Sequence, residues 1–294
     1  MSCRRRQFLP VLPALLTTTA AVEASPAAAL VAPPLRVVYP RPVRDVDRSS
    51  LFPLQLLKLA LDASGVRCEL SASKDLMVQS RALKELEAPQ DHLHIAWSMT
   101  SVQREQSLLP VRIPIFKGLY GWRVLLIKQG QQAAWSEVDG LDGLKRFTLV
   151  QGHDWPDTEI LRANGLTVTT GSSFAALFKM LDMGRAQAFP RSVLEAGWEQ
   201  EGQKQLFAVE PKLVLHYPTA VYFFVRPGDQ RLAALVELGL NRLLANGGFD
   251  RLFDAHHAEP LRQAGLHKRR VIELHNPLLP EQTPLARKEL WRLP

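Results

Sequence analysis

Cysteine is almost absent from this chain of 294 residues, in which only Cys3 and Cys68 occur. Cys3 lies in an N-terminal segment that we expect to be removed, which leaves one cysteine in the mature chain. No disulfide can then form within that chain, even in a compartment that permits one. Because Cys3 precedes the apolar run of the leader, it is not a lipoprotein acceptor. A disulfide-stabilised miniprotein is therefore excluded.

Several sequence motifs are also missing. The chain has no Gly-x-Ser-x-Gly, no Gly-x-x-x-x-Gly-Lys and no Gly-x-Gly-x-x-Gly, so the common nucleophile and phosphate-loop signatures are absent. The net charge is +7, but the basic residues are scattered and form no stripe with interleaved aromatic residues. We therefore expect no nucleic-acid partner. With 46% hydrophobic and 22% charged residues, the composition is that of a folded protein.

The N-terminal region has the order of a secretory leader. Arg4, Arg5 and Arg6 precede the uncharged run 7–22, and small residues follow up to Ala29. This order predicts a signal peptide over residues 1–29 and a mature protein in the periplasm. The alternative is an uncleaved anchor, although the run is shorter than the ~20 apolar residues that span a bilayer. The segment 5–9, Arg-Arg-Gln-Phe-Leu, also fits a twin-arginine signal.

Beyond residue 34, strand-like and helix-like segments alternate. The predicted strands are 35–39, 66–71, 92–97, 122–128, 146–150, 167–170, 186–189, 206–209, 213–217 and 221–225. The predicted helices are 50–63, 77–88, 101–108, 156–163, 172–183, 192–199, 232–244, 249–255 and 260–264. This alternation indicates an α/β fold with largely parallel sheets.

The first segment that carries chemistry follows the strand ending at Trp97. Ser98, Thr100 and Ser101 lie at a predicted helix start, with Arg104 one turn into the helix. Hydroxyl groups, free helix N–H groups and a guanidinium fork together can bind a carboxylate or a phosphate. The alternative is an ordinary serine N-cap with Arg104 in a surface ion pair.

The second such segment joins a predicted strand to a helix at residues 150–157. Gly152 permits close approach of the backbone, and His153, Asp154 and Trp155 follow it. Ligands of open α/β sheets bind at the carboxyl ends of strands, where this corner lies. The alternative is a plain strand–turn–helix corner capped by Asp154.

At these positions the chain resembles a known family. Residues 101–104, with the prolines that follow, are similar to a Thr-x-x-Arg segment, and residues 149–154 to a Gly-Val-x-x-Gly-Thr-Thr corner. Residues 181–188 are similar to a Leu-x-x-Gly-Arg-x-Asp-Ala segment, and residues 246–250 to an Asp-Gly-Thr-Phe segment. All four belong, in this order, to the amino-acid-binding-like family of type II periplasmic solute-binding proteins, the receptors of ABC transporters. The resemblance covers residues 35 to about 264.

The resemblance implies an α/β, two-lobed type II periplasmic-binding-protein fold with two hinge crossovers, at 117–121 and 217–222. Lobe 1 would comprise 35–118 and 220–294, and lobe 2 would comprise 121–217. The implied function is capture of a small polar or anionic solute between the lobes, for a transporter or a sensor. No cofactor or metal is expected, and the protein is expected to be a monomer. The expected ligand-binding residues are Tyr39, Trp97, Ser98, Thr100, Ser101, Arg104, Gly152, His153, Asp154, Trp155 and Arg191.

The chain departs from the family where the ligand ammonium is usually held. Ser192 stands where amino-acid-binding members have an aspartate, and Arg191 precedes it. We therefore expect standard α-amino acids to bind poorly, and an acidic or otherwise non-amino solute to be preferred. Asp154, Asp157 and Glu195 leave open a relocated ammonium site.

A second function class uses the same scaffold. Dehydratases of cyclic acids need a general acid/base in the cleft, and His153 with Asp154 or Glu195 could provide one. The tail from 267 to 294 extends beyond the usual end of the family, and the sequence indicates no function for it.

The leader leads to a direct prediction. The mature protein should begin between Ser25 and Leu30 and be recovered from the periplasm, as N-terminal sequencing and intact mass will show. An intact N-terminus on membrane-bound protein would contradict this. Replacing Arg5 and Arg6 with lysine blocks export only if the twin-arginine route is used.

Overall fold

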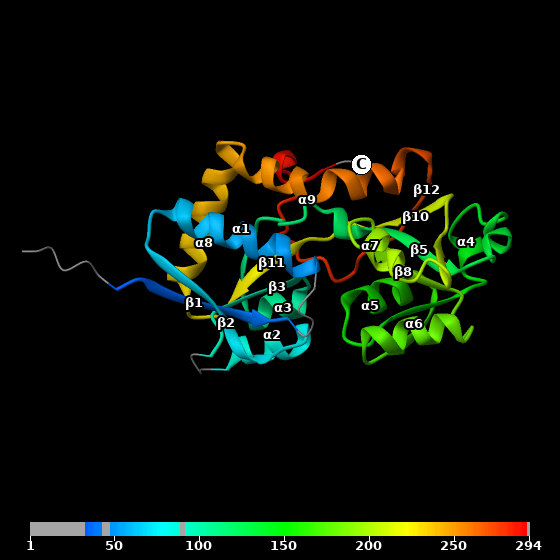
Figure 1. Cartoon of the computed structure of the whole chain (residues 1–294), viewed down its shortest axis with the longest axis horizontal. Helices are drawn as coiled ribbons and strands as arrows, with labels where there is room; N and C mark the ends of the chain where they lie inside the picture. The colour runs from blue at the N-terminus through cyan, green and yellow to red at the C-terminus, as the bar shows by residue number, and fades with distance from the viewer. Residues whose placement is uncertain (1–32, 43–47, 89–91, 293–294) are drawn as a thin grey trace, which may run out of the picture. The chain divides into compact units, whose positions relative to one another are not determined.

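A computed structural model describes residues 33–42, 48–88 and 92–292 of the chain. The predicted leader, residues 1–29, lies outside the described residues. The described residues from Pro34 onward belong to one compact unit. Its strands form two groups (Figure 1), which we call lobe 1 and lobe 2.

Lobe 1 contains a parallel pair and a three-stranded antiparallel sheet. The pair consists of β1 (Leu35–Arg41) and β2 (Cys68–Leu76), and the sheet of β3 (Ile95–Met99), β11 (Val221–Val225) and β4 (Leu109–Val111), in that order. His94 joins the two. Its N–H donates to the Val38 carbonyl at 2.9 Å, and its Nδ1 accepts from the Val38 N–H at 2.9 Å. The strands of lobe 1 are thereby connected across the gap between β1 and β3.

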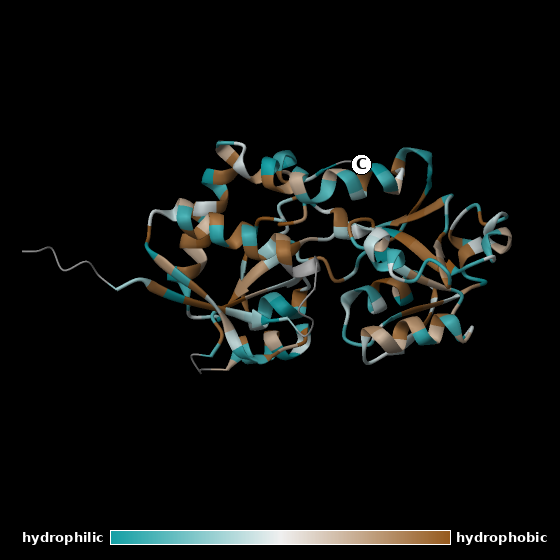
Figure 2. Cartoon of the chain, viewed as in Figure 1, coloured by the Kyte–Doolittle hydropathy of each residue, from teal (hydrophilic) through white to brown (hydrophobic). Residues whose placement is uncertain are grey.

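Helices cover the sheets of lobe 1. They are α1 (Arg48–Ser64), α2 (Gln79–Glu87), α3 (Val102–Ser107) and α8 (Gln230–Ala245). Helices α1 and α8 pack closely because Gly239 has no side chain, and a Cβ there would overlap the Ala60 carbonyl. Figure 2 shows apolar residues concentrated on the central strands, while the helices carry both apolar and polar residues.

Lobe 2 is built on a seven-stranded mixed sheet. The strands are β5 (Trp122–Lys128), β6 (Thr148–Gly152), β7 (Thr167–Gly171), β8 (Ala188–Ser192), β9 (Phe207–Val209), β10 (Leu213–His216) and β12 (Arg270–Glu273). Their order is β12-β10-β5-β8-β6-β7, and β9 also pairs with β5. The helices of this lobe are α4 (Leu141–Leu144), α5 (Pro156–Ala163), α6 (Phe174–Asp182) and α7 (Ala196–Glu201).

Two of the connections between the lobes lie where the sequence predicts them, and we call them the first and second crossover. The first contains the 3-10 turn η1 (Leu119–Gly121), and the second follows β10. They lie against each other, because the Tyr217 N–H donates to the Gly121 carbonyl at 3.1 Å. A Cβ on Gly121 would overlap the carbonyl of Tyr217, so only glycine fits this approach.

The C-terminal part of the chain differs from the prediction that 220–294 belongs to lobe 1. Strand β12 pairs in parallel with β10, which places residues 270–273 in the sheet of lobe 2. The helix before it, α9 (Gly248–Ala264), runs unbroken through Pro260, where the sequence predicts two helices. Phe249, Phe253 and His257 recur at intervals of four residues on one buried face, and this packing outweighs the backbone hydrogen bond that Pro260 cannot make.

After β12 the tail contacts both lobes. The side chain of Asn164, at the end of α5, exchanges two hydrogen bonds with the backbone of His275, at 2.7 and 2.9 Å. Three residues on, the Leu278 carbonyl accepts from the Val102 N–H at 3.0 Å, at the start of α3. The tail therefore bridges lobe 2 to lobe 1, in addition to the two crossovers. Among the described residues, no helix is both long enough and apolar enough to cross a membrane.

The end of the tail covers the first crossover. Gly118 has φ of 78°, and a Cβ there would lie 2.5 Å from Cε3 of Trp291. We expect Gly118→Ala to lower the free energy of unfolding by about 2–4 kcal/mol, since left-handed strain and overlap with the indole add. Gly130 has φ of 84°, and a Cβ there would have no described atom within 4 Å, so Gly130→Ala should cost only the strain, about 1–2 kcal/mol. Urea unfolding measures both. Equal losses for the two variants would show that Trp291 does not press on Gly118.

Candidate functional site

A cavity of about 460 Å³ is lined by residues of both lobes and of the first crossover. Lobe 1 contributes residues near β1, α2 and β3, among them Met77, Trp97 and Met99. Tyr120 and Phe116 line it from the crossover. Lobe 2 contributes the 152–157 corner, the start of α6 around Phe174, and the charged residues Arg123, Asp157, Arg191, Glu195 and Glu199. A volume of this size suits a small solute.

The predicted binding residues divide into two groups at this cavity. Trp97, Gly152, His153, Asp154, Trp155 and Arg191 line it. Tyr39, Ser98, Thr100, Ser101 and Arg104 are not among the lining residues. The second group consists of lobe 1 residues. The hydroxyl groups of Ser98, Thr100 and Ser101 form hydrogen bonds within their own segment.

Arg104 organises the start of α3. Its Nη1 donates to Ser98 Oγ and to the Met99 carbonyl, both at 2.7 Å, and its backbone N–H donates to Ser101 Oγ, which caps the helix. Thr100 Oγ1 donates to Glu105 Oε1 at 2.6 Å. Each of the three hydroxyl groups therefore has a partner within its own segment.

The charge of Arg104 is not neutralised by contact. Among the described residues, no carboxylate lies within ion-pair distance of its guanidinium group, although Asp154 and Asp157 act on it from further away. Burial lowers the pKa of Arg104 to about 10, against the opposing effect of these two carboxylates. Its Nη2 lies 3.4 Å from the Asp154 carbonyl in lobe 2. An anionic group placed beside Arg104 would therefore gain a charged partner.

The 152–157 corner brings backbone and indole together. The ring of Trp155 lies over Gly152, where a Cβ would be 2.5 Å from Cδ2, so the predicted close approach at this glycine is made by the chain's own side chain. Thr158 Oγ1 donates to the Gly152 carbonyl at 2.7 Å. His153 is exposed, and its Nδ1 is 3.3 Å from the Gly171 carbonyl. Asp154 is 3.9 Å from the imidazole, beyond hydrogen-bond distance.

Arg191 is enclosed by partners. Its Nε and Nη2 donate to both oxygens of Glu199 at 2.7 and 2.6 Å, and Nη2 is 3.1 Å from Glu195. Its Cζ lies 5.0, 5.6 and 5.1 Å from the ring centres of Trp155, Phe174 and Phe189. Burial alone would lower its pKa, but the two glutamates raise the pKa of Arg191 above its usual range. The sequence interpretation treats this charge as available to an anion, whereas in the structure it is already paired.

Ser192, at the position of the usual aspartate, has a hydroxyl group that already has hydrogen-bond partners. It is fully buried. Its Oγ donates to the Leu119 carbonyl at 3.2 Å and accepts from the Leu194 N–H. This hydroxyl group holds β8 against the first crossover.

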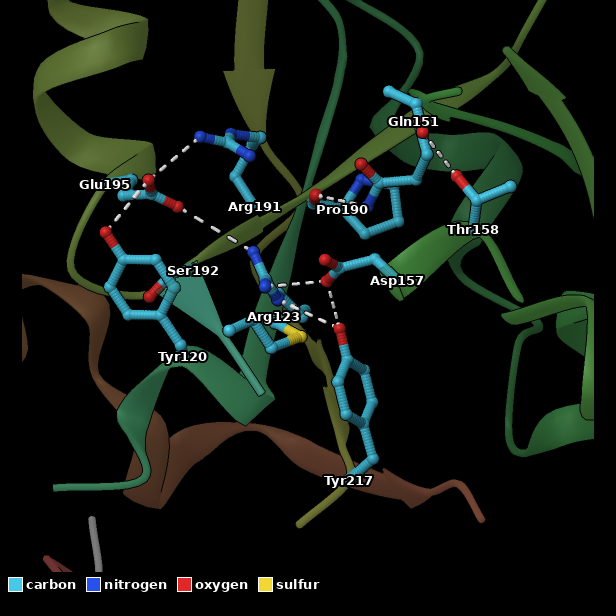
Figure 3. Close-up of polar contacts among 12 residues, drawn as sticks. Tyr120, Arg123, Gln151, Asp157, Thr158, Pro190, Arg191, Ser192, Glu195 and Tyr217 are labelled. Atoms are coloured by element: carbon cyan, nitrogen blue, oxygen red, sulfur yellow. Dashed lines mark hydrogen bonds and ion pairs between the residues drawn. The ribbon is translucent and has the colours of Figure 1, made fainter. Parts of the chain in front are cut away.

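The sequence interpretation missed a buried ionic network behind the cavity (Figure 3). Arg123, on β5, is 2.6 Å from Asp157 through Nη2 and donates to the Tyr217 hydroxyl through Nε at 3.1 Å. Tyr217 donates in turn to Asp157. The side chains of Arg123 and Asp157 are 3% and 4% exposed. Asp157 and Tyr217 raise the pKa of Arg123 above its usual range, although burial opposes them.

Glu195 connects this network to Arg191. Its Oε1 accepts from the Tyr120 hydroxyl at 3.1 Å, and its Oε2 lies 3.7 Å from Arg123 Nη1. A signal for the network was present in the sequence, because Arg123 lies among the apolar residues 122–127 of the strand Trp122–Lys128. A charge on a buried strand requires an opposite charge nearby.

The chain was compared with protein-family models, curated proteins and solved structures. No protein-family model matches the chain, and no curated protein matches it in sequence. Solved structures do match. An ancestral arginine-binding protein bound to arginine is 16% identical with a TM-score of 0.56, and the match covers 76% of this chain and 97% of that one. A periplasmic binding protein of Salmonella typhimurium with high arginine specificity is 14% identical with a TM-score of 0.56, covering 76% and 99%.

A third solved structure has a comparable similarity. The VFT2 domain of Bordetella pertussis BvgS, solved as a double mutant, is 17% identical with a TM-score of 0.57, and the match covers 76% of this chain and 93% of that one. At these identities the likeness establishes the fold. The chain has the mixed α/β, two-lobed fold of type II periplasmic binding proteins, as the sequence predicts.

The buried pair of Arg123 and Asp157 gives a prediction about stability. Asp157→Asn leaves Arg123 without its nearest charge, so the free energy of unfolding should fall by about 3–5 kcal/mol. Asp154→Asn, three residues away, changes a carboxylate that is 31% exposed. This variant should shift the free energy of unfolding by less than about 1 kcal/mol. Urea unfolding measures both. Similar small shifts in the two variants would show that the Arg123 charge is compensated elsewhere.

Proposed function

We propose that this protein is an exported solute-binding protein that captures a small solute in the cavity between its lobes. The observation that carries the proposal is a cavity of about 460 Å³, lined by both lobes and a crossover, in a fold otherwise seen in periplasmic binding proteins. Such folds bind by closing two lobes over a ligand. Delivery is to an ABC transporter, which the likeness to the substrate binding protein of an amino acid ABC transporter supports, or to a sensor.

The ligand contacts follow from the lining. Trp97 and Trp155 supply apolar walls from the two lobes, and His153 and Asp154 supply polar groups at the lobe 2 corner. Arg104 does not line the cavity, but its Nη2 lies 3.4 Å from the carbonyl of the lining residue Asp154, and it supplies a positive charge that no described carboxylate contacts. Ser98 and Ser101 act by holding Arg104, and Thr100 acts by bonding Glu105 in the same helix. Tyr39 packs against the hydrophobic core.

The location of the protein follows from its leader. We propose cleavage after Ala29, release into the periplasm and function as a monomer, with twin-arginine export as one of two routes. Closure of the lobes would have to accommodate the tail, because the Asn164 and Val102 contacts of the tail connect lobe 2 to lobe 1.

An enzymatic function has less support. It needs a general acid/base held by a hydrogen bond in the cavity, but His153 is exposed and 3.9 Å from Asp154. The neighbouring structures are binding proteins. Turnover of a bound solute would favour the enzymatic alternative.

Native mass spectrometry of protein purified from the periplasm tests the proposal directly. We expect a small solute to co-purify, and its removal should lower the melting temperature. Protein that carries no solute, and that no member of a panel of amino acids, dicarboxylates, aromatic acids and phosphorylated small molecules stabilises, would refute a solute-binding function.

Variants of Arg104 test its role in binding the solute. Arg104→Ala should abolish binding of the co-purified solute. It also removes the hydrogen bonds to Ser98 Oγ and to the Met99 carbonyl, so the free energy of unfolding should fall by about 1–3 kcal/mol while the protein still folds. Arg104→Lys should also weaken binding, because a lysine cannot make a bidentate contact. Arg81→Ala, an exposed arginine of α2, should bind as the wild type does. Normal binding by Arg104→Ala would give Arg104 a purely structural role.

A further inference from the structure

The tail of the chain, residues 274–292, is anchored in both lobes over a short stretch. Its lobe 2 anchor is His275, whose backbone exchanges two hydrogen bonds with the Asn164 side chain at 2.7 and 2.9 Å. Its lobe 1 anchor is Leu278, whose carbonyl accepts from the Val102 N–H at 3.0 Å. Three residues of fully extended chain span at most about 11 Å. While both anchors hold, the end of α5 and the start of α3 cannot separate further than this segment reaches.

The tail also contacts both crossovers. Asn276 is buried, and its Nδ2 donates to the Pro218 carbonyl of the second crossover at 2.8 Å. At the other end of the tail, the Arg292 N–H donates to the Lys117 carbonyl at 3.0 Å. Lys117 has φ of 49°, a left-handed conformation that non-glycine residues seldom adopt, and its Nζ lies 2.6 Å from Asp250 of α9. The backbone of both crossovers is thereby bonded to the tail.

The lobe 1 anchor lies in the segment that carries Arg104. Val102 is the first residue of α3, and its N–H is one of the groups that a helix leaves without an internal partner. The Leu278 carbonyl takes this donor. Two residues later, Arg104 extends toward lobe 2, where its Nη2 lies 3.4 Å from the Asp154 carbonyl. The tail therefore holds the helical turn at which lobe 1 approaches lobe 2.

We propose that the tail is a strap that limits how far the two lobes open about the crossovers. In the unliganded protein the strap keeps the start of α3 close to lobe 2. A solute then closes lobes that are already near each other, which lowers the cost of reorganisation on binding. This consequence rests on the solute-binding function proposed above, whereas the limit on opening does not.

Lengthening the strap tests the limit without removing an anchor. Six residues, Gly-Ser-Gly-Ser-Gly-Ser, are inserted after Pro277, which is exposed, and they add about 20 Å of reach. The control carries the same insertion after Glu281, which is also exposed and lies beyond the lobe 1 anchor. Each insertion interrupts one local turn, at 276–278 or at 280–283. The two variants therefore differ in whether the segment between the anchors is longer.

Double electron–electron resonance measures the separation of the lobes in unliganded protein. Spin labels are attached at Lys84→Cys in α2 and Lys179→Cys in α6, two exposed positions on helices that line the cavity from opposite lobes. The two native cysteines are replaced by serine. The insertion after Pro277 should broaden the distance distribution and extend it to distances longer by up to about 20 Å. The insertion after Glu281 should leave the distribution as in the wild type.

Substitutions at the two anchors provide a second variant that keeps the length of the tail. Val102→Pro removes the N–H that Leu278 accepts, and proline suits the first residue of a helix. The preceding Ser101 already has the extended backbone that a proline requires before it. Asn164→Ala removes both bonds to His275. The double variant should open as the lengthened one does, while Val102→Ala, which keeps the N–H, should match the wild type.

Unchanged distances in either folded variant would overturn the strap, with folding checked by circular dichroism. A shift to shorter distances would also overturn it, because the tail would then hold the lobes apart. The measurement needs no solute, so it separates this inference from the proposed function. Wider opening of the variants supports the strap even where no solute co-purifies with the wild type. A co-purified solute together with unchanged distances would leave the solute-binding function standing and refute the strap.

Discussion

The buried contact of Arg123 with Asp157 is the interaction on which the arrangement of the site depends. It joins β5, at the centre of the lobe 2 sheet, to the first turn of α5, and Tyr217 adds the second crossover through hydrogen bonds to both side chains. Glu195 then connects Arg123 to Arg191 and, through Tyr120, to the first crossover. Each crossover therefore contains a tyrosine that donates to a carboxylate lining the cavity: Tyr120 to Glu195, and Tyr217 to Asp157. Charged groups of the cavity wall are thus hydrogen-bonded to both crossovers.

Much of the fold could be predicted from residue patterns, because apolar periodicity reports burial directly. The strands Trp122–Lys128 and Val221–Val225 and the helix Pro156–Ala163 have the predicted bounds. Strand β12 was missed, because Arg270–Glu273 carries two charges and alternates weakly, and it becomes a strand by pairing with β10. Pro260 predicts a helix boundary that packing of the α9 face overrides. Both errors concern tertiary contacts that a local pattern does not contain.

The site was less predictable than the fold for a physical reason. Sequence shows which residues carry charge, but only the structure shows which charges are already paired. Arg191 is a plausible anion receptor by position, yet Glu199, eight residues later, takes two of its donors. Arg104 differs from Arg191, because no carboxylate contacts it among the described residues. Its pKa is lowered to about 10, chiefly by burial. The unpaired charges, and not the charged residues as such, define what the cavity can bind.

These unpaired charges have opposite signs in the two lobes. Within the described part of the chain, Arg104 has no carboxylate in contact at the start of α3, and the lobe 2 wall holds the two arginines Arg123 and Arg191 against three buried carboxylates. Burial lowers the pKa of Arg104, and Asp154 and Asp157 in lobe 2 oppose this effect. Arg104 Nη2 also lies 3.4 Å from the Asp154 carbonyl, so its charge faces lobe 2 although it does not line the cavity. The attraction between these opposite charges therefore acts between the lobes.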